Sequence, residues 1–193
     1  MTPGQPPQAE TLADVAAASL DDWRARGLWR SPSVFATAQR AEASLRDGAH
    51  RTDAVLFSSS NYLGLAEDPR LADAAIAAIR TFGAGSGGSR LTTGTNELHL
   101  AAEAACARLT GYDDAVLFAT GYQANVSTLQ ALAAACASAG GLTIVSDARN
   151  HASIIDGCRL AKASGAEVCV TPHRDVDAVA RCLSQRTTAH ALV

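Results

Sequence analysis

The sequence predicts an α/β fold with a mostly parallel sheet, and three observations lead to this prediction. The chain has 193 residues, of which 48% are hydrophobic, so it can bury a sizeable core. From about residue 96 onward, short apolar runs alternate with stretches of helical periodicity. A helix between successive strands is the arrangement that makes those strands parallel, so the second half predicts α/β layering.

Fewer elements are predicted in the first half. Residues 1–10 are polar and rich in proline, and we expect them to be frayed. Apolar residues at helical spacing predict an amphipathic helix over 12–27, and residues 54–57 form a short apolar strand candidate. Asp68 and Pro69 have the residue types that start helices, and they predict a helix that ends at the next glycine.

The second half alternates regularly, and its last apolar run continues to the final residue. Because a buried strand leaves its neighbours unpaired when it is cut, we expect the chain to be a fragment of a larger domain. The predicted order is a helix near 96–110, a strand at 115–118, a helix at 123–138, a strand at 142–145, a helix at 151–163, a strand at 168–170, a helix around 176–183 and a strand from 188.

Charge and hydropathy exclude several classes of partner. The net charge is -3 and no run of like charges is present, which argues against nucleic acid as a partner. No stretch approaches the roughly 20 apolar residues that span a bilayer, and the first residues lack the pattern of a signal peptide. We therefore expect a cytoplasmic protein without a membrane partner.

The cysteines are odd in number, widely spaced and without a C-x-x-C pair. This pattern predicts neither a disulfide framework nor a metal site. We expect small core or helix-face residues in a reducing compartment. The five are Cys106, Cys136, Cys158, Cys169 and Cys182.

The glycine-rich stretch GAGSGG formally matches the dinucleotide motif G-x-G-x-x-G. It follows a predicted helix rather than a strand, which is the wrong context for a dinucleotide site. A Walker loop needs a lysine, and Arg90 is the only base nearby. The loop 83–95 therefore either connects two helices or lines an active site or a subunit contact.

Two predicted helix starts share the carboxyl edge of the sheet. Gly121 and Tyr122 follow the strand at 115–118, and the free N–H groups of such a turn bind phosphate well. His151 opens the helix after the strand at 142–145, where it could stack on an aromatic ligand or exchange a proton. Every strand-to-helix turn has this geometry and histidines often cap helices, so a purely structural interpretation remains open from these residues alone.

Four segments together resemble, in order and spacing, the α-oxoamine synthases, a family of fold-type I pyridoxal 5'-phosphate (PLP) enzymes. The resemblance covers residues 58–162. It implies an N-terminal helix and arm over 1–50, followed over 51–193 by an incomplete PLP-binding large domain of a PLP-dependent transferase. The segments are SSSNYLGLAEDPRL, GAGSGGSRLTTGTNELHLAAE, LFATGYQANVSTLQAL and SDARNHASIIDGCRLA.

Within the family, GSGGSR with TGT is more similar to the 8-amino-7-oxononanoate synthase branch than to the aminolevulinate synthase or aminoketobutyrate ligase branches. That branch implies a decarboxylative condensation of L-alanine with pimeloyl-CoA, or with pimeloyl-acyl-carrier protein, in biotin biosynthesis, with PLP as electron sink. A branch that uses glycine and an acyl-CoA, and a non-catalytic truncated homologue, remain alternatives. Family members are homodimers, which makes the loop 83–95 a candidate contributor to a neighbouring subunit's site.

The resemblance also implies roles for single residues. Gly121 and Tyr122 would hold the cofactor phosphate, while His151 would stack over the pyridine ring and contact substrate. Arg30 matches a substrate-contacting position, where its fixed charge suits a carboxylate or the phosphates of the carrier; a solvated helix-end arginine is the alternative. Asn61 receives a weaker substrate role, because the residue before it departs from the family pattern.

Lys162 is the only lysine in the chain. The resemblance implies a Schiff-base lysine and an aspartate at the pyridine nitrogen, both expected beyond Val193, so no catalytic residue is expected within the chain. Lys162 would lie about 16 Å along the helix from His151, at ~1.5 Å per residue. We therefore expect it at the surface, away from the ligand.

Overall fold

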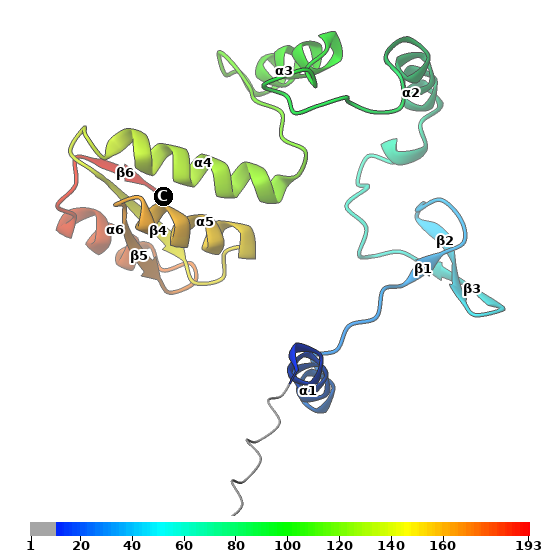
Figure 1. Ribbon diagram of the computed structural model, residues 1–193, viewed down its shortest axis with the longest axis horizontal. Helices are drawn as coiled ribbons and strands as arrows, with labels where there is room; N and C mark the ends of the chain where they lie inside the picture. The colour runs from blue at the N-terminus through cyan, green and yellow to red at the C-terminus, as the bar shows by residue number, and fades with distance from the viewer. Residues whose placement is uncertain (1–10) are drawn as a thin grey trace, which may run out of the picture. The chain divides into compact units, whose positions relative to one another are not determined.

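The computed structural model describes residues 11–193, so the fraying predicted for residues 1–10 lies outside the described residues. The described residues divide into two units, an N-terminal unit up to Gly85 and a second unit, Ser86–Val193 (Figure 1). The domain division that the sequence predicts at residue 50 stays a prediction.

The first helix of the N-terminal unit, α1 (Leu12–Ala25), confirms the helix predicted over 12–27. Thr11 is its N-cap, and the Thr11 hydroxyl accepts from the backbone N–H of Asp14 at 3.2 Å. The Asp14 carboxylate accepts in return from the Thr11 N–H at 3.0 Å. This reciprocal capping box satisfies two free donors of the first turn. No residue of α1 is buried, so its caps rather than packing define its start.

A three-stranded antiparallel sheet follows, in the order β1 (Val34–Phe35), β2 (Glu42–Asp47) and β3 (His50–Val55). The sequence predicts only an apolar strand at 54–57, and that prediction is wrong in its bounds. β3 pairs with β2 from His50 opposite Asp47 to Val55 opposite Glu42, so its ladder ends where β2 begins. Mostly polar strands lack a clear period of two, which is why the sequence gives little sign of the hairpin.

The helix α2 (Pro69–Phe82) confirms its predicted bounds, after a short 3-10 turn, η1 (Leu65–Glu67). The Asp68 carboxylate accepts from the backbone N–H of Arg70 at 2.9 Å, and Pro69 occupies the first helical position. Gly83, with φ of 84°, ends the helix in a conformation that favours glycine. Local chemistry alone therefore defines both ends of α2.

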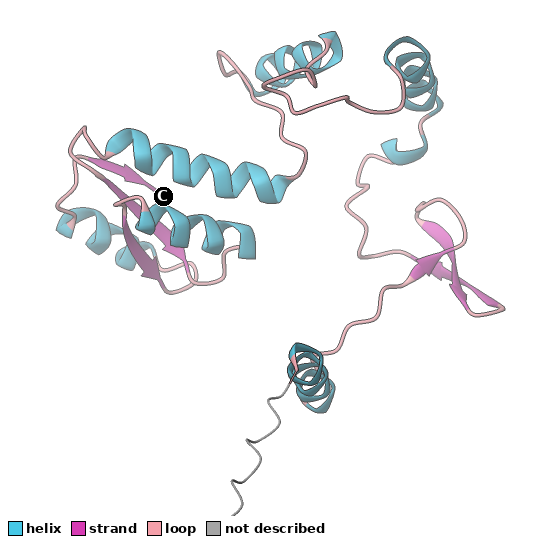
Figure 2. Cartoon of the chain, viewed as in Figure 1, coloured by secondary structure: helices cyan, strands magenta, loops and turns pink. Residues whose placement is uncertain are grey.

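The second unit contains the predicted parallel sheet, in the order β5 (Glu167–Thr171), β4 (Leu142–Asp147) and β6 (His190–Leu192). Figure 2 shows these strands with helices packed beside them. Both neighbours run parallel to the central strand β4. The first five residues of β4 are all buried, so both faces of this strand are covered. The α/β class with a parallel sheet is thereby confirmed for this unit.

Three helices pack on this sheet: α4 (Gly121–Cys136), α5 (Ala152–Ala163) and α6 (Val176–Gln185). The helix α3 (Glu97–Thr110) precedes them in the same unit. The helices α4 and α5 pack closely on each other, because Gly157 has no side chain at their contact. A Cβ at Gly157 would lie 2.7 Å from Leu129 Cδ1 and 3.2 Å from the carbonyl oxygen of Asn125. The core between the two helices and the sheet consists of Leu129, Ala133, Leu142, Ile144, Cys158, Ala161 and Ala166.

Residues 115–118 form no strand, so that prediction is wrong. A strand needs a neighbouring strand for its backbone groups, and none of the strands within residues 11–193 pairs with this segment. Instead, Leu117 N–H donates to Glu103 Oε1 at 2.8 Å, and its carbonyl accepts from Arg90 Nη1 at 3.0 Å. An ion pair thus satisfies the backbone groups that a strand would otherwise satisfy.

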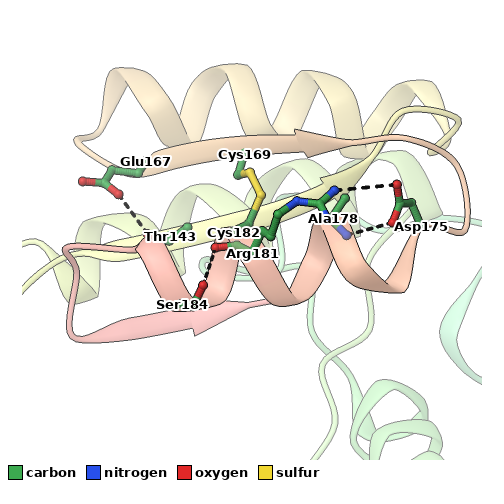
Figure 3. The surroundings of a disulfide bond; sticks show 8 residues. All are labelled: Thr143, Glu167, Cys169, Asp175, Ala178, Arg181, Cys182 and Ser184. Carbon is green, nitrogen blue, oxygen red and sulfur yellow. Dashed lines mark hydrogen bonds and ion pairs between the residues drawn. A yellow bond between two sulfur atoms is a disulfide. The ribbon is translucent and has the colours of Figure 1, made fainter.

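The cysteine prediction is also wrong, because Cys169 of β5 and Cys182 of α6 form a disulfide (Figure 3). Their Cα atoms lie 6.4 Å apart, a usual separation for a disulfide. The α6 helix packs back on β5 and brings together two residues that are 13 positions apart. A search for short cysteine motifs does not detect such a pair. Cys106, Cys136 and Cys158 are free thiols.

Candidate functional site

Gly121 and Tyr122 lie in the first turn of α4, although the segment before them is irregular rather than a strand. Thr120 is the N-cap, and its hydroxyl accepts from the N–H of Gln123 at 3.1 Å. The N–H groups of Gly121 and Tyr122 have no acceptor among the residues that the structure describes. A Cβ at Gly121 would meet no atom within 4 Å, so the space beside this turn is open. Free N–H groups at an open helix start are suited to an anionic group such as phosphate.

His151 is the N-cap of α5, at the position where the sequence predicts the helix to open. Its Nδ1 accepts from the backbone N–H of Ser153 at 3.2 Å and lies 2.7 Å from Ser153 Oγ. The preceding Asn150 donates from Nδ2 to Ser146 Oγ at 3.0 Å, which ties the loop to β4. One ring nitrogen of His151 is thus fixed by its own helix, while the residue remains exposed.

Two side-chain bonds join these helix starts. Tyr122 donates from its hydroxyl to Asp156 Oδ2 at 2.8 Å, and Asn125 donates from Nδ2 to Ser153 Oγ at 2.9 Å. The Tyr122 bond lowers the pKa of the Asp156 carboxyl, and that carboxylate raises the pKa of the Tyr122 hydroxyl. The structure therefore brings Gly121, Tyr122 and His151 together as one candidate site.

Asp147, at the end of β4, is a supporting residue that sequence reasoning missed. Its carboxylate accepts from the backbone N–H of Arg149 at 2.7 Å, from the N–H of Arg174 at 2.9 Å and from His173 Nδ1 at 3.0 Å. The Arg149 N–H is the largest of the causes that lower the pKa of Asp147 to about 2. The sequence pattern that could have identified Asp147 is an aspartate shortly after an apolar run. Its bonds fix the loop that leads to His151.

A groove of about 850 Å³ adjoins the start of α4 within the second unit. The loop 86–95 contributes much of its lining, and Ala119 and Gln123, which flank Gly121 in the sequence, line it as well. Loop residues therefore line a groove, while their place in an active site stays a prediction. Whether a neighbouring subunit uses the loop stays a prediction.

An ion pair between Arg90 and Glu103 lies among the lining residues of this groove. Arg90 Nη2 lies 3.2 Å from Glu103 Oε2. The hydrogen bond from Arg90, followed by that from the Leu117 N–H, lowers the pKa of Glu103 to about 2. The pair holds the segment that leads into Gly121 by both backbone groups of Leu117.

Besides His151, the residues predicted to contact substrate are Arg30 and Asn61, and both belong to the N-terminal unit. Arg30 donates from Nη1 to the carbonyl oxygen of Gly27 at 3.0 Å, so its side chain contacts local backbone. Asn61 accepts from the N–H of Ala66 at 3.1 Å and donates from Nδ2 to the carbonyl oxygen of Gln39 at 3.4 Å. Their contact with substrate stays a prediction.

Lys162 lies in the last turn of α5 and is exposed, which confirms its predicted surface position. Among residues 11–193, no group of three or more His, Cys, Asp or Glu is arranged to hold a metal ion. In the same part of the chain, every helix is too short or too polar to cross a membrane.

The model of a family described as aminotransferase class I and II matches residues 52–193. A biotin biosynthesis bifunctional protein BioWF of Cutibacterium acnes is 48% identical over 174 residues, which cover 90% of this chain and 25% of that protein. An 8-amino-7-oxononanoate synthase of Mycolicibacterium gilvum is 48% identical over 137 residues, which cover 71% of this chain and 34% of that protein. The chain thus spans about a quarter to a third of these curated relatives.

Solved structures of SPT with PLP are also similar to this chain. A high-resolution structure of SPT with a PLP internal aldimine matches with a TM-score of 0.74 and 29% identity, over 92% of this chain and 43% of that chain. A second structure of SPT with PLP matches with a TM-score of 0.73 and 30% identity, over 90% of this chain and 41% of that chain.

Proposed function

Because the chain belongs to the aminotransferase class I and II family, we propose that it takes part in the PLP-dependent reaction of an 8-amino-7-oxononanoate synthase. This reaction is the decarboxylative condensation of L-alanine with a pimeloyl thioester, either pimeloyl-CoA or pimeloyl-acyl-carrier protein, in biotin biosynthesis. Relatives that carry this name or a biotin-biosynthesis name, each 48% identical, support this branch of the α-oxoamine synthases. The likeness to the SPT structures confirms the predicted class, that of a fold-type I PLP-dependent transferase.

The observation that carries the proposal is that the N-terminal turns of α4 and α5 are joined by side-chain hydrogen bonds. The N–H groups of Gly121 and Tyr122 are free for a phosphate, in an open space that a side chain at Gly121 would narrow. His151 lies at the start of the adjacent helix with its ring held at one edge. N–H groups that can donate to a phosphate, on a helix packed against the one that begins at the exposed ring of His151, fit a phosphorylated aromatic cofactor such as PLP.

PLP, when bound, would supply an electron sink for the α-carbon of the amino acid, so that the α-proton can leave, the α-carbon can attack the thioester with release of the thiol carrier, and the carboxylate can leave as CO2. The residues of this chain would hold the cofactor and orient its ring. The first turn of α4 would fix the phosphate, and His151 would cover one face of the ring. Arg30 and Asn61 are proposed to contact the acyl or amino-acid substrate, with the charge of Arg30 suited to a carboxylate or to carrier phosphates.

The first experiment tests PLP binding and the position of Lys162 together. The purified protein is mixed with a stoichiometric amount of PLP and reduced with borohydride, and its peptides are mapped by mass. We expect no stoichiometric adduct at Lys162, because this residue lies in the last turn of α5, at the opposite end of the helix from His151. Stoichiometric labelling of Lys162 that alanine blocks would show that the site is mapped incorrectly.

A matched pair of variants tests the phosphate site. Gly121→Ala places a methyl group where no protein atom lies within 4 Å, so the fold should tolerate it. We expect the affinity for PLP to fall by ~10-fold or more, because the methyl obstructs the approach of a phosphate to the N–H groups. Ala131→Val, at an exposed position later on α4, is the control. Equal PLP affinity of parent and both variants would count against the site.

Product analysis separates the branches of the family. The full-length protein, which would include the Schiff-base lysine expected beyond Val193, is incubated with PLP, pimeloyl-CoA and either alanine or glycine, and the amino ketone is identified by mass. Product from alanine supports the proposed reaction, and product from glycine alone favours another branch. Failure of the full-length protein to bind PLP favours a non-catalytic homologue.

We also propose that the protein is a homodimer in which the loop 83–95 borders the cofactor of the neighbouring subunit. Gly87 has no atom within 4 Å of an added Cβ, so Gly87→Trp should not disturb the subunit itself. We expect this variant to lose PLP faster during dialysis than the parent. Unchanged retention, with a dimer seen by sedimentation, would exclude the loop from the site.

A further inference from the structure

We propose that Ser153 and Asn125 are positioning residues that hold the ring of His151 in one tautomer, with its proton on Nε2. The relevance to PLP rests on the proposed function, whereas the tautomer itself follows from hydrogen bonds within α4 and α5.

The backbone of Ser153 determines the role of the ring nitrogen next to it. A backbone N–H can only donate, and that of Ser153 lies 3.2 Å from His151 Nδ1 in a hydrogen-bonding geometry. Nδ1 must therefore accept, so it carries no proton. A neutral imidazole with an unprotonated Nδ1 carries its proton on Nε2.

The hydroxyl of Ser153 continues the series of hydrogen bonds from His151 to the neighbouring helix α4. Ser153 Oγ lies 2.7 Å from Nδ1, and because Nδ1 accepts, the hydroxyl uses its single proton for this bond. The oxygen then needs a donor, and Asn125 Nδ2 supplies one at 2.9 Å. An amide oxygen in that place would leave the hydroxyl with two acceptors and one proton. The bonds therefore run in one direction, from Asn125 through Ser153 to His151.

The burial of Ser153 makes the donor-to-acceptor direction of these hydrogen bonds hard to reverse. Ser153 is 0% exposed, so water cannot replace either of its partners. Gly157 keeps α4 and α5 close enough for the bond between Asn125 and Ser153, since any Cβ there would meet Leu129 and the Asn125 carbonyl. A buried hydroxyl that loses a partner is costly, and this cost maintains the arrangement.

The consequence is a free donor on the exposed side of the ring. Nε2 of His151 has no hydrogen-bond partner among residues 11–193. With Nδ1 used by α5, the ring offers Nε2–H to an acceptor atom of a ligand. The opposite tautomer would lose the cap of α5 and offer only an acceptor there.

The tautomer is measured directly on the purified protein labelled with ¹⁵N-histidine. Correlation spectra of ring nitrogens and carbon-bound protons distinguish the two tautomers, and His151→Gln assigns the signal among the five histidines. We expect the Nε2–H form to exceed the other by at least about tenfold, because in the other form the backbone N–H of Ser153 and its buried hydroxyl proton both lose their acceptor. A predominant Nδ1–H form in the parent protein overturns the proposal.

Asn125→Asp tests whether Asn125 sets the direction of the hydrogen bonds that run through Ser153 to His151. A carboxylate would accept from the Ser153 hydroxyl and withdraw it from Nδ1, so we expect the Nδ1 signal to shift toward that of a nitrogen with a weaker hydrogen bond. Thr128→Ala, at an exposed position on the same helix, should leave the signal unchanged. An unaltered Nδ1 signal in folded Asn125→Asp overturns the role of Asn125, and if that variant does not fold, the parent spectrum decides. These spectra are recorded without PLP, so their outcome is independent of the test of cofactor binding.

Discussion

The hydroxyl of Tyr122 donates a hydrogen bond to the Asp156 carboxylate across 2.8 Å, and this bond joins the first turn of α4 to α5. The side chain and the backbone of Tyr122 thus have separate tasks. Its side chain fixes two helix starts to each other, while its N–H has no acceptor among the described residues. The bond also lowers the pKa of the Asp156 carboxyl, so its contribution to folding stability depends on pH.

Tyr122→Phe should raise the pKa of Asp156, because the Tyr122 bond is the largest cause that lowers it from 3.8. A carboxyl with a depressed folded-state pKa stabilises above its unfolded pKa, and this contribution is lost as pH falls through the folded pKa. The variant should therefore be less stable than the parent at pH 7, and the difference should shrink below pH 3.8.

Urea denaturation at a series of pH values, with NMR titration of the carboxyl, measures both effects. Tyr112→Phe is the control, since Tyr112 is 75% exposed and its hydroxyl has no hydrogen bond among the described residues. Parallel pH profiles for parent and Tyr122→Phe would contradict the coupling.

Glu103→Gln should weaken the support of the segment before α4 in a pH-dependent manner. The pKa of Glu103 is lowered from 4.5 to about 2, first by its bond with Arg90. Its stabilisation is present above pH 4.5 and is lost as pH falls toward 2. We expect the variant to be less stable than the parent at pH 7 and nearly equal to it at pH 2.

Denaturation midpoints at both pH values test this, with Glu97→Gln on the same helix as the control for a lost carboxylate. Glu97 forms no ion pair among residues 11–193. If Glu103→Gln matched the parent at pH 7, the ion pair would not support Leu117.

Leu129→Ala should destabilise the unit by about 2–5 kcal/mol, because a core side chain between α4 and β4 is lost and leaves a cavity. Gly157→Leu should destabilise it for the opposite reason, since even a Cβ at Gly157 meets Leu129 Cδ1 at 2.7 Å. Urea unfolding followed by circular dichroism gives both values. Because the two sites are in contact, we expect the double variant to be less unstable than the sum of the single variants; strict additivity would mean that the helices do not meet there.

The denatured protein should show three reactive thiols before reduction and five after it, because Cys169 and Cys182 are paired and three cysteines are free. Thiol titration in denaturant measures this count. Cys182→Ser should leave four thiols whether or not a reductant is present. Five thiols in unreduced parent protein would show that the pair is not oxidised in solution.

Much of the candidate site could be predicted because its signals are local. Thr120 and Gly121 mark a helix start by residue type, and His151 follows an apolar run by a short polar link. The strand expected at 115–118 failed because strand formation depends on a partner elsewhere in the chain. The roles of Arg30 and Asn61 rest on resemblance and stay predictions.

By itself, the sequence determined both ends of α2, the alternation of helices and strands from α4 onward and the family resemblance, because caps, periodicity and ordered motifs depend on neighbouring residues. Asp68 and Pro69 define the start of α2 without help from the rest of the fold. Only the tertiary structure decided which distant groups meet. Asn125 reaches Ser153, and Cys169 reaches Cys182, because helices pack on strands and on one another at separations that no local pattern encodes.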